Sequence, residues 1–333
     1  MNGLGNVLVS LTGLQNHALI VVALLLLGLV AASVMARDIS GPAVPGTVPA
    51  ELVLRVRSWW WMVGLIVLAL ALGRTAAIVF FGFVSYLTVK EYLSIVPTRQ
   101  VDRTVLLWVY AAVPIQYWLI WMEWYGIFTI FVPVYMFVLI PTSMVLRGQT
   151  EHFLKAVGTL HWGLMLGVYS LGHVAYLLVL PPHEAGAPGS IAAGASLVIA
   201  LLVLTEANDV FQYIWGKSCG RSKIVPKVSP GKTWEGFLGG LGSTMLLALV
   251  LLPFLTPHSG FLALGCGILV AVAGFFGDVT ESALKRDLGL KDSSSLIPGH
   301  GGILDRVDSL IFTAPLFFHY TRFFHYLPGM PPG

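Results

Sequence analysis

Residues 17–36 read HALIVVALLLLGLVAASVMA, a run without a single Asp, Glu, Lys or Arg. A helix rises 1.5 Å per residue, so about 20 apolar residues cross the ~30 Å hydrocarbon core of a bilayer. The whole chain of 333 residues is 56% hydrophobic and 11% charged, whereas soluble domains carry roughly 25% charged residues. This composition excludes a water-soluble globule. The net charge of +3 produces no overall field that would favour nucleic-acid binding.

Nine further apolar runs follow the first one. They lie near residues 58–73, 75–93, 104–122, 127–146, 157–180, 191–213, 236–255, 261–276 and 309–324. Only helices and closed barrels satisfy every backbone polar group in lipid, and runs of this length indicate helices. We therefore predict an all-α polytopic integral membrane protein with about ten transmembrane helices. The second and third runs nearly touch at Arg74, so nine helices is the alternative.

The basic residues predict the orientation of these helices. If ten helices alternate and the N-terminus lies outside, every Lys and Arg except Arg74 and Arg322 falls on one side. By the positive-inside rule that side is the cytoplasm. We therefore expect an integral protein of the cell inner (plasma) membrane, with both termini outside and the active site facing the cytoplasm. Nine helices would place the N-terminus inside.

About half of the charged residues gather in two segments after residue 205. We predict that residues 1–200, with about six helices, form a transmembrane scaffold. Residues 201–333 are predicted to form a catalytic transmembrane region with two charged cytoplasmic loops, at 216–235 and 281–308. The two cysteines of the chain, Cys219 and Cys266, lack the spacing of metal ligands.

Carboxylates within or at the edge of apolar helices are costly and are functional candidates. Asp209 lies late in an apolar run, one turn after Glu206. Asp278 ends another run, and Glu281 and Lys285 follow it at spacings that put them on one helix stripe. An ordinary ion pair that serves folding is the alternative role for Asp209.

Residues 228–236 read VSPGKTWEG and open an apolar helix. Their Gly-Lys-Thr resembles the end of a P-loop, but Pro226 stands where that motif requires Gly. A more general property remains, because Ser229, Lys232 and the free N–H groups of a helix start can bind an anion. Lys232 could equally be an ordinary positive-inside residue.

The signature segment, residues 282–308, reads SALKRDLGLKDSSSLIPGHGGILDRVD. Its glycines allow a tight turn that brings backbone N–H groups and His300 close to a ligand. Lys and Arg beside Asp in one cleft suit a polyphosphate bound through Mg²⁺, because carboxylates hold the cation and basic groups neutralise the phosphates. The candidates are Lys285, Arg286, Lys291, Gly301, Gly302, Asp305, Arg306 and Asp308.

These motifs together resemble the phosphatidate cytidylyltransferase (CDP-diacylglycerol synthase) family. The resemblance rests on the unbroken signature segment, on residues 226–236 and on Gly277-Asp278 followed by Glu281-Ser282, and it covers about residues 205–310. It implies a transferase of phospholipid biosynthesis that joins CTP to phosphatidic acid and releases CDP-diacylglycerol and pyrophosphate. Mg²⁺, with K⁺ as a monovalent partner, would assist.

The resemblance also implies roles for individual residues. Asp278 and Asp305 would hold the metal. The residues that would neutralise the phosphate charge are Lys232, Lys285, Arg286 and Arg306. The substrate-binding candidates are Lys227, Ser229, Lys291, His300, Gly301 and Gly302, with Asp209 and Asp308 for metal or orientation. One departure is Phe211-Gln212, where the family commonly has Gly-Ala. It leaves open the acceptor lipid and the preference for CTP or dCTP.

Three alternatives remain at this stage. The chain could transfer cytidylyl to another lipid or polyol phosphate, or it could be a CTP-dependent lipid kinase that releases CDP. A polytopic transporter is the alternative from a different class, although transporter sites usually lie near the midplane rather than in surface loops. The partners expected are CTP, phosphatidic acid and the bilayer, with no nucleic acid, and a homodimer is left open.

Overall fold

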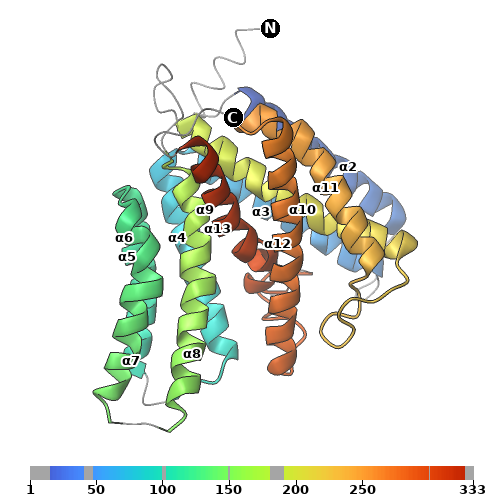
Figure 1. Cartoon of the computed structure of the whole chain (residues 1–333). Coiled ribbons are helices and arrows are strands. Elements are labelled where there is room, and N and C mark those ends of the chain that lie inside the picture. The colour runs from blue at the N-terminus through green and yellow to red at the C-terminus, as the bar shows by residue number, and fades with distance from the viewer. Residues whose placement is uncertain are drawn as a thin grey trace.

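The computed structural model describes residues 16–40, 48–99, 103–148, 151–180, 191–299 and 301–326. Within these residues the chain folds into ten helices, two of which contain a π-helical turn (Figure 1). The predicted all-α class is confirmed. The elements are α2 Asn16–Ser40, α3 Val48–Ala71, α4 Arg74–Ile95, α5 Arg103–Trp121, α6 Tyr125–Ile130 with η2 Phe131–Met136 and α7 Phe137–Val145, α8 Phe153–Leu164 with η3 Met165–Ser170 and α9 Leu171–Leu177, α10 Ile191–Cys219, α11 Trp234–Leu255, α12 Gly260–Asp287 and α13 Leu304–His325.

Eight of these helices are long and apolar enough to cross a membrane. The other two are the helix interrupted by η3 and α13. Helix α13 carries several polar side chains, yet Phe317 and Phe318 are fully buried in the core. A helix surrounded by other helices does not have to present an apolar face to lipid on every side.

The boundary between the second and third predicted helices is a tight turn. Helix α3 ends at Ala71 and α4 begins at Arg74, and Gly73 adopts φ 101° between them. Only Gly takes this backbone conformation without strain. The structure therefore separates the two helices, as the ten-helix prediction requires.

The two basic residues that depart from the positive-inside pattern both have partners. Arg74 Nη2 lies 2.5 Å from Glu123 Oε1, and the Arg322 guanidinium lies 3.7 Å from the centre of the Tyr125 ring. These contacts join α4, α6 and α13 at the end of the bundle opposite the charged loops. An ion pair and a cation–π contact reduce the cost of leaving a cation on the disfavoured side.

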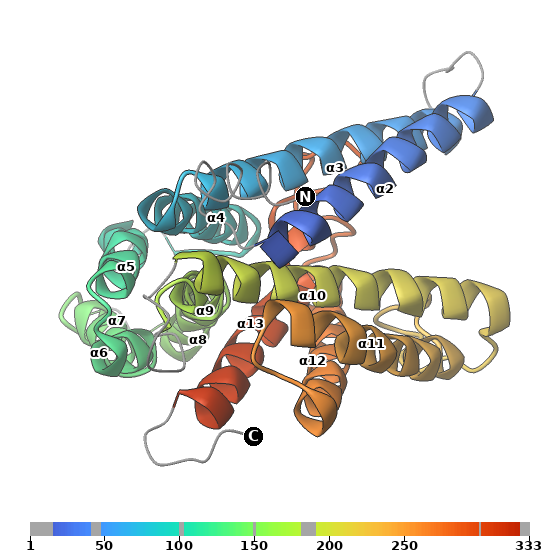
Figure 2. The same cartoon turned by 90° about the horizontal axis from the view of Figure 1, so that it is seen from above.

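Helix α10 runs through the middle of the molecule, between the α2–α3 pair and the α11–α12 pair (Figure 2). Its contact with α11 is close because Gly236 has no side chain. A Cβ on Gly236 would lie 2.9 Å from the Gln212 carbonyl oxygen and 3.0 Å from Gly216 Cα. This packing holds the charged end of α10 against the first turn of α11.

Helix α12 is longer than its apolar run predicted. It continues to Asp287 and has 28 residues, which corresponds to ~42 Å at 1.5 Å per residue. The last turns therefore extend beyond the span of a hydrocarbon core. Asp278, Glu281 and Lys285 lie on this extension and share one rigid helix rather than a loop.

Candidate active site

Both predicted charged loops lie at the same end of the molecule, the lower part of Figure 1, which we call the charged end. The loops touch, since Arg286 Nε lies 3.4 Å from the Val228 carbonyl oxygen. The N-terminal helices reach the same place. Ser58 of α3 donates a hydrogen bond to the Pro298 carbonyl at 2.8 Å. The tertiary fold thus closes segments far apart in sequence around one site.

The first cluster is centred on Lys285. Its Nζ lies 2.5 Å from Glu281 Oε2 and 2.6 Å from Asp305 Oδ1. Asp305 also accepts hydrogen bonds from the Ser293 backbone N–H, the Ser293 hydroxyl and the Gly302 N–H, at 2.7–2.9 Å. Burial raises the pKa of Asp305, but Lys285 and these hydrogen bonds lower it by more. The carboxylate is therefore ionised, and protein donors occupy its oxygens.

The second cluster is centred on Lys232. Its Nζ lies 2.5 Å from Asp278 Oδ2 and donates to Gln212 Oε1 at 3.2 Å. Ser282 donates to the other oxygen of Asp278 at 3.3 Å. Burial lowers the pKa of Lys232, but Asp278 and Asp209 raise it by more. Lys232 therefore stays cationic at neutral pH inside a largely buried site.

A group of carboxylates surrounds the second cluster. Asp308 interacts electrostatically with Asp278, Asp209 and Glu281, and the buried Oδ1 of Asp209 has no hydrogen-bond partner among the residues that the structure describes. Such crowding of negative charge suits a cation. No three His, Cys, Asp or Glu side chains within the described residues converge on one metal position. Mg²⁺ does not need three, because it commonly uses one or two carboxylates together with substrate phosphates.

The two predicted metal ligands belong to different clusters. Asp278 contacts Lys232, whereas Asp305 contacts Lys285. A metal at either carboxylate would have to displace a protein donor, because Lys232 and Ser282 contact the two oxygens of Asp278. Asp278 differs from Asp305 in its interaction with two further carboxylates, Asp209 and Asp308. This concentration of negative charge fits a hard divalent cation.

Other predicted residues lie at the rim. Lys227 and Lys291 are exposed, and the Ser229 carbonyl accepts from the backbone N–H of Lys232 at 3.2 Å. Arg286 is also exposed, and it hydrogen-bonds to backbone carbonyls of both loops. His300 lies outside the described residues. The rim residues could meet a phosphate entering from solvent, because their cationic ends are free of acidic partners among the contacts described.

The structure adds one residue that the motifs do not contain, Glu91 at the end of α4. Its carboxylate accepts hydrogen bonds from the Ser294 hydroxyl and from the backbone N–H groups of Ile303 and Leu304, and it lies within hydrogen-bond distance of the Ser293 hydroxyl. Only 7% of the residue is exposed. The argument that identified Asp209 and Asp278, a carboxylate at the edge of an apolar helix, could have identified it too.

Two glycines of the signature segment make these contacts possible. Gly301 adopts φ +77°, and a Cβ there would overlap the carboxylate of Asp305. A Cβ on Gly302 would overlap Glu91 and Ser293. The predicted role of both glycines was ligand binding. In the structure they let two carboxylates approach the backbone, and the N–H of Gly302 points to Asp305.

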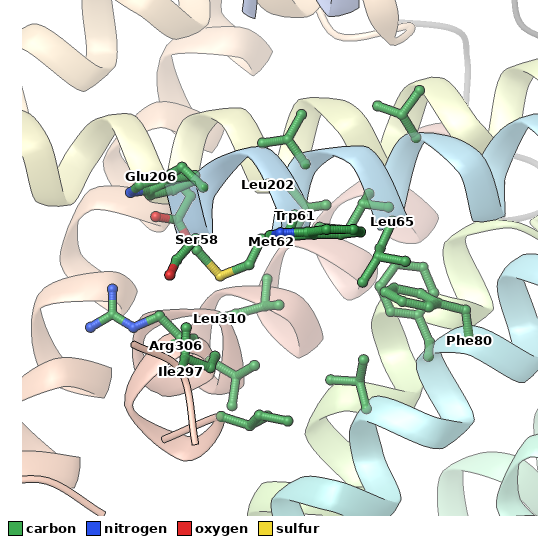
Figure 3. Close-up of a pocket in the computed structure, with 18 of the residues that line it drawn as sticks. Ser58, Trp61, Met62, Leu65, Phe80, Leu202, Glu206, Ile297, Arg306 and Leu310 are labelled. Atoms are coloured by element: carbon green, nitrogen blue, oxygen red, sulfur yellow. The ribbon is translucent and has the colours of Figure 1, made fainter. Parts of the chain in front are cut away.

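An apolar cavity of about 530 Å³ adjoins the charged end. It is lined mainly by residues of α3, α4, α10 and α13 and by residues 296–298, with one residue from α9 and two residues from α2. Ser58, Glu206 and Arg306 lie toward one side of it, and Leu65 and Phe80 lie toward the other (Figure 3). Within the described part of the chain, the buried Nε of Arg306 has no hydrogen-bond partner. The cavity is thus a mainly apolar chamber with a charged margin.

The fold and site define a polytopic integral membrane protein with two clusters of lysines and carboxylates at one end of its helices. The sequence profile of the family described as Cytidylyltransferase family matches residues 53–324. The chain therefore belongs to the cytidylyltransferase family, whose members are nucleotidyltransferases.

Individual relatives agree with this assignment. The chain is 45% identical to "Uncharacterized protein YnbB" of Escherichia coli (strain K12), over 82% of this chain and 88% of that one. It is 43% identical to the phosphatidate cytidylyltransferase of Haemophilus influenzae, over 39% of this chain and 47% of that one. The Synechocystis phosphatidate cytidylyltransferase is 40% identical, over 42% and 48%. These matches confirm the resemblance, and they span about half the length of the named phosphatidate enzymes.

Proposed function

We propose that the protein is a CTP:phosphatidate cytidylyltransferase, which forms CDP-diacylglycerol and pyrophosphate. One observation carries the proposal. Arg306 lines the apolar cavity, while its neighbours Asp305 and Asp308 on the same helical turn belong to the charged site. An acceptor with an apolar tail in the cavity would therefore have its head group beside the groups that suit a triphosphate.

The chemistry requires no protein nucleophile. The second pKa of a phosphate monoester is about 6, so the lipid phosphate is mostly dianionic at neutral pH. One of its oxygens attacks the α-phosphorus of CTP, and the bond from that phosphorus to the bridging oxygen of the β-phosphate breaks. Pyrophosphate leaves with that oxygen. The protein contributes positioning and charge neutralisation.

We assign the protein groups as follows. Lys232 and Lys285 neutralise charge on the triphosphate and on the departing pyrophosphate, and Arg306 orients the lipid phosphate at the margin of the cavity. Asp278 with Asp308 would hold Mg²⁺, which supplies charge stabilisation to the phosphates when bound. Asp305 then acts by holding Lys285 in place.

The test is an assay of purified protein in detergent with Mg²⁺ and labelled CTP or dCTP. The acceptors are phosphatidate, lysophosphatidate, polyprenyl phosphate and diacylglycerol. We expect phosphatidate to give a cytidine-bearing lipid and one equivalent of pyrophosphate. Reaction of a different phosphate alone would overturn the acceptor and keep the transfer. CDP and a lipid phosphate from diacylglycerol would instead show a lipid kinase.

If the cavity holds the acyl chains, filling it should weaken the binding of long-chain acceptors. Leu65→Trp fills part of the cavity and should raise KM for long-chain phosphatidate roughly tenfold, since each excluded CH₂ costs about 0.8 kcal/mol. Dihexanoyl phosphatidate should be nearly unaffected. Leu68→Trp is the matched control, because Leu68 lies on the same helix, is 53% exposed and does not line the cavity. Equal effects of both variants would exclude the cavity as the acyl site.

A further inference from the structure

Glu91 makes a concentrated set of contacts with the signature segment. Ser294 Oγ, Ile303 N and Leu304 N donate to it at 3.1, 3.0 and 3.1 Å, and the Ser293 hydroxyl is also within hydrogen-bond distance. The two backbone donors belong to Ile303, the residue that precedes α13, and to Leu304, its first residue, and N–H groups at a helix start have no partner within their own helix. Glu91 therefore caps α13 from another helix and faces the positive end of its dipole.

Ser293 connects Glu91 to the first lysine cluster. Its hydroxyl lies within hydrogen-bond distance of both Glu91 Oε1 and Asp305 Oδ2, and its single proton can serve one of them at a time. Asp305 in turn holds Lys285 at 2.6 Å. A continuous path thus runs from α4 through Ser293 and Asp305 to a cation of the site.

We propose that Glu91 is a positioning residue for cytidylyl transfer. It holds residues 293–304 against α4, and so sets the place of Asp305 and Lys285 without touching the reacting atoms. This inference rests on the proposed function. It goes beyond the motifs quoted for the family, none of which contains Glu91, although the family match at residues 53–324 covers this position.

A purely structural role would predict something different. Loss of a structural residue lowers the amount of folded protein and leaves the remaining molecules active. A positioning residue changes turnover in molecules that are folded. Misplacement of catalytic groups acts on the transition state, so kcat should fall while nucleotide binding changes little.

The experiment compares Glu91→Gln with Glu123→Gln in full-length protein. Glu123 is the control because it is a carboxylate in the turn between α5 and α6 that pairs with Arg74 at the opposite end of the bundle. We expect Glu91→Gln to lower kcat about 10–100-fold, as typical for loss of a supporting hydrogen-bond partner, with KM for CTP changed by less than about twofold. Glu123→Gln should retain full turnover.

Two further measurements separate the possible outcomes. Amide hydrogen exchange of residues 301–306 should accelerate in Glu91→Gln, while that of residues 234–240 stays unchanged. Ser293→Ala should lower kcat in the same direction, and the double variant should be no slower than Glu91→Gln because both act on one path. If Glu91→Gln does not fold, the kcat of Ser293→Ala tests the proposal instead.

Full turnover of Glu91→Gln, a rise in KM for CTP with unchanged kcat, or multiplying effects in the double variant would overturn the proposal. If the wild-type protein transfers no cytidylyl group to any phosphate, the proposed function fails. The exchange measurement then decides by itself whether Glu91 holds residues 293–304.

Discussion

Asp278→Asn should abolish cytidylyl transfer, by about a thousandfold or more, in a protein that still folds and inserts. Asp278 pairs with Lys232 at 2.5 Å and also interacts with Asp308. The neutral amide of the introduced Asn cannot hold a divalent cation as a carboxylate does. The substitution also leaves Lys232 without its ionic partner. A bound metal ion stabilises the charge of the transition state by several kcal/mol. Each 1.36 kcal/mol of activation free energy changes the rate by a factor of ten.

Asp287→Asn is the control for this variant. Asp287 lies at the exposed end of the same helix, so it tests the loss of a negative charge near the site without touching either cluster. Both variants should give the wild-type yield in membranes. Turnover of Asp278→Asn within tenfold of wild type would remove Asp278 from the metal and phosphate site.

Lys285→Met should have the largest combined effect on stability and turnover. Lys285 is 12% exposed and is the cation shared by Glu281 and Asp305, which are 3% and 5% exposed. Removing it leaves two buried carboxylates without a counter-charge, and breaking a buried pair costs about 3–5 kcal/mol. We expect a lower thermal midpoint in detergent and no measurable pyrophosphate release.

A second variant separates the two effects of this substitution. Lys285→Met combined with Glu281→Gln removes one of the unpaired charges and should recover much of the lost stability. Turnover should stay absent, because the cation is still missing. Lys285→Arg should fold normally and keep part of the activity. Recovery of full turnover in the double variant would show that Lys285 serves folding alone.

The fold followed from the sequence to a large extent. Apolar runs near 20 residues predicted ten helices, and ten are present in the described residues. The errors are in where helices end. Helix α12 continues past the run that predicted it, because backbone hydrogen bonds extend a helix beyond the apolar core when its polar turns find partners, as Lys285 does with Asp305.

The site followed from the sequence in part. The i, i+4 spacing of Glu281 and Lys285 predicted a shared helix face, and their ion pair confirms it. Spacing could not show which cation meets which carboxylate across helices, since that depends on how α11, α12 and α13 pack. The pairing of Lys232 with Asp278, 46 positions apart in the chain, is of this kind. The metal and substrate roles stay predictions.

The sequence by itself determined the class of the protein: a helical membrane protein with a cytidylyltransferase signature and two charged loops. These properties are local, because hydropathy, helix periodicity and motif spacing depend only on residues that are close together in the sequence. Only the tertiary structure decided that Glu91 of α4 caps α13, and that residues of α3, α4, α10 and α13 line an apolar cavity beside Arg306. The physical reason is that such contacts join residues about 200 positions apart, and their geometry is set by helix packing rather than by any local pattern.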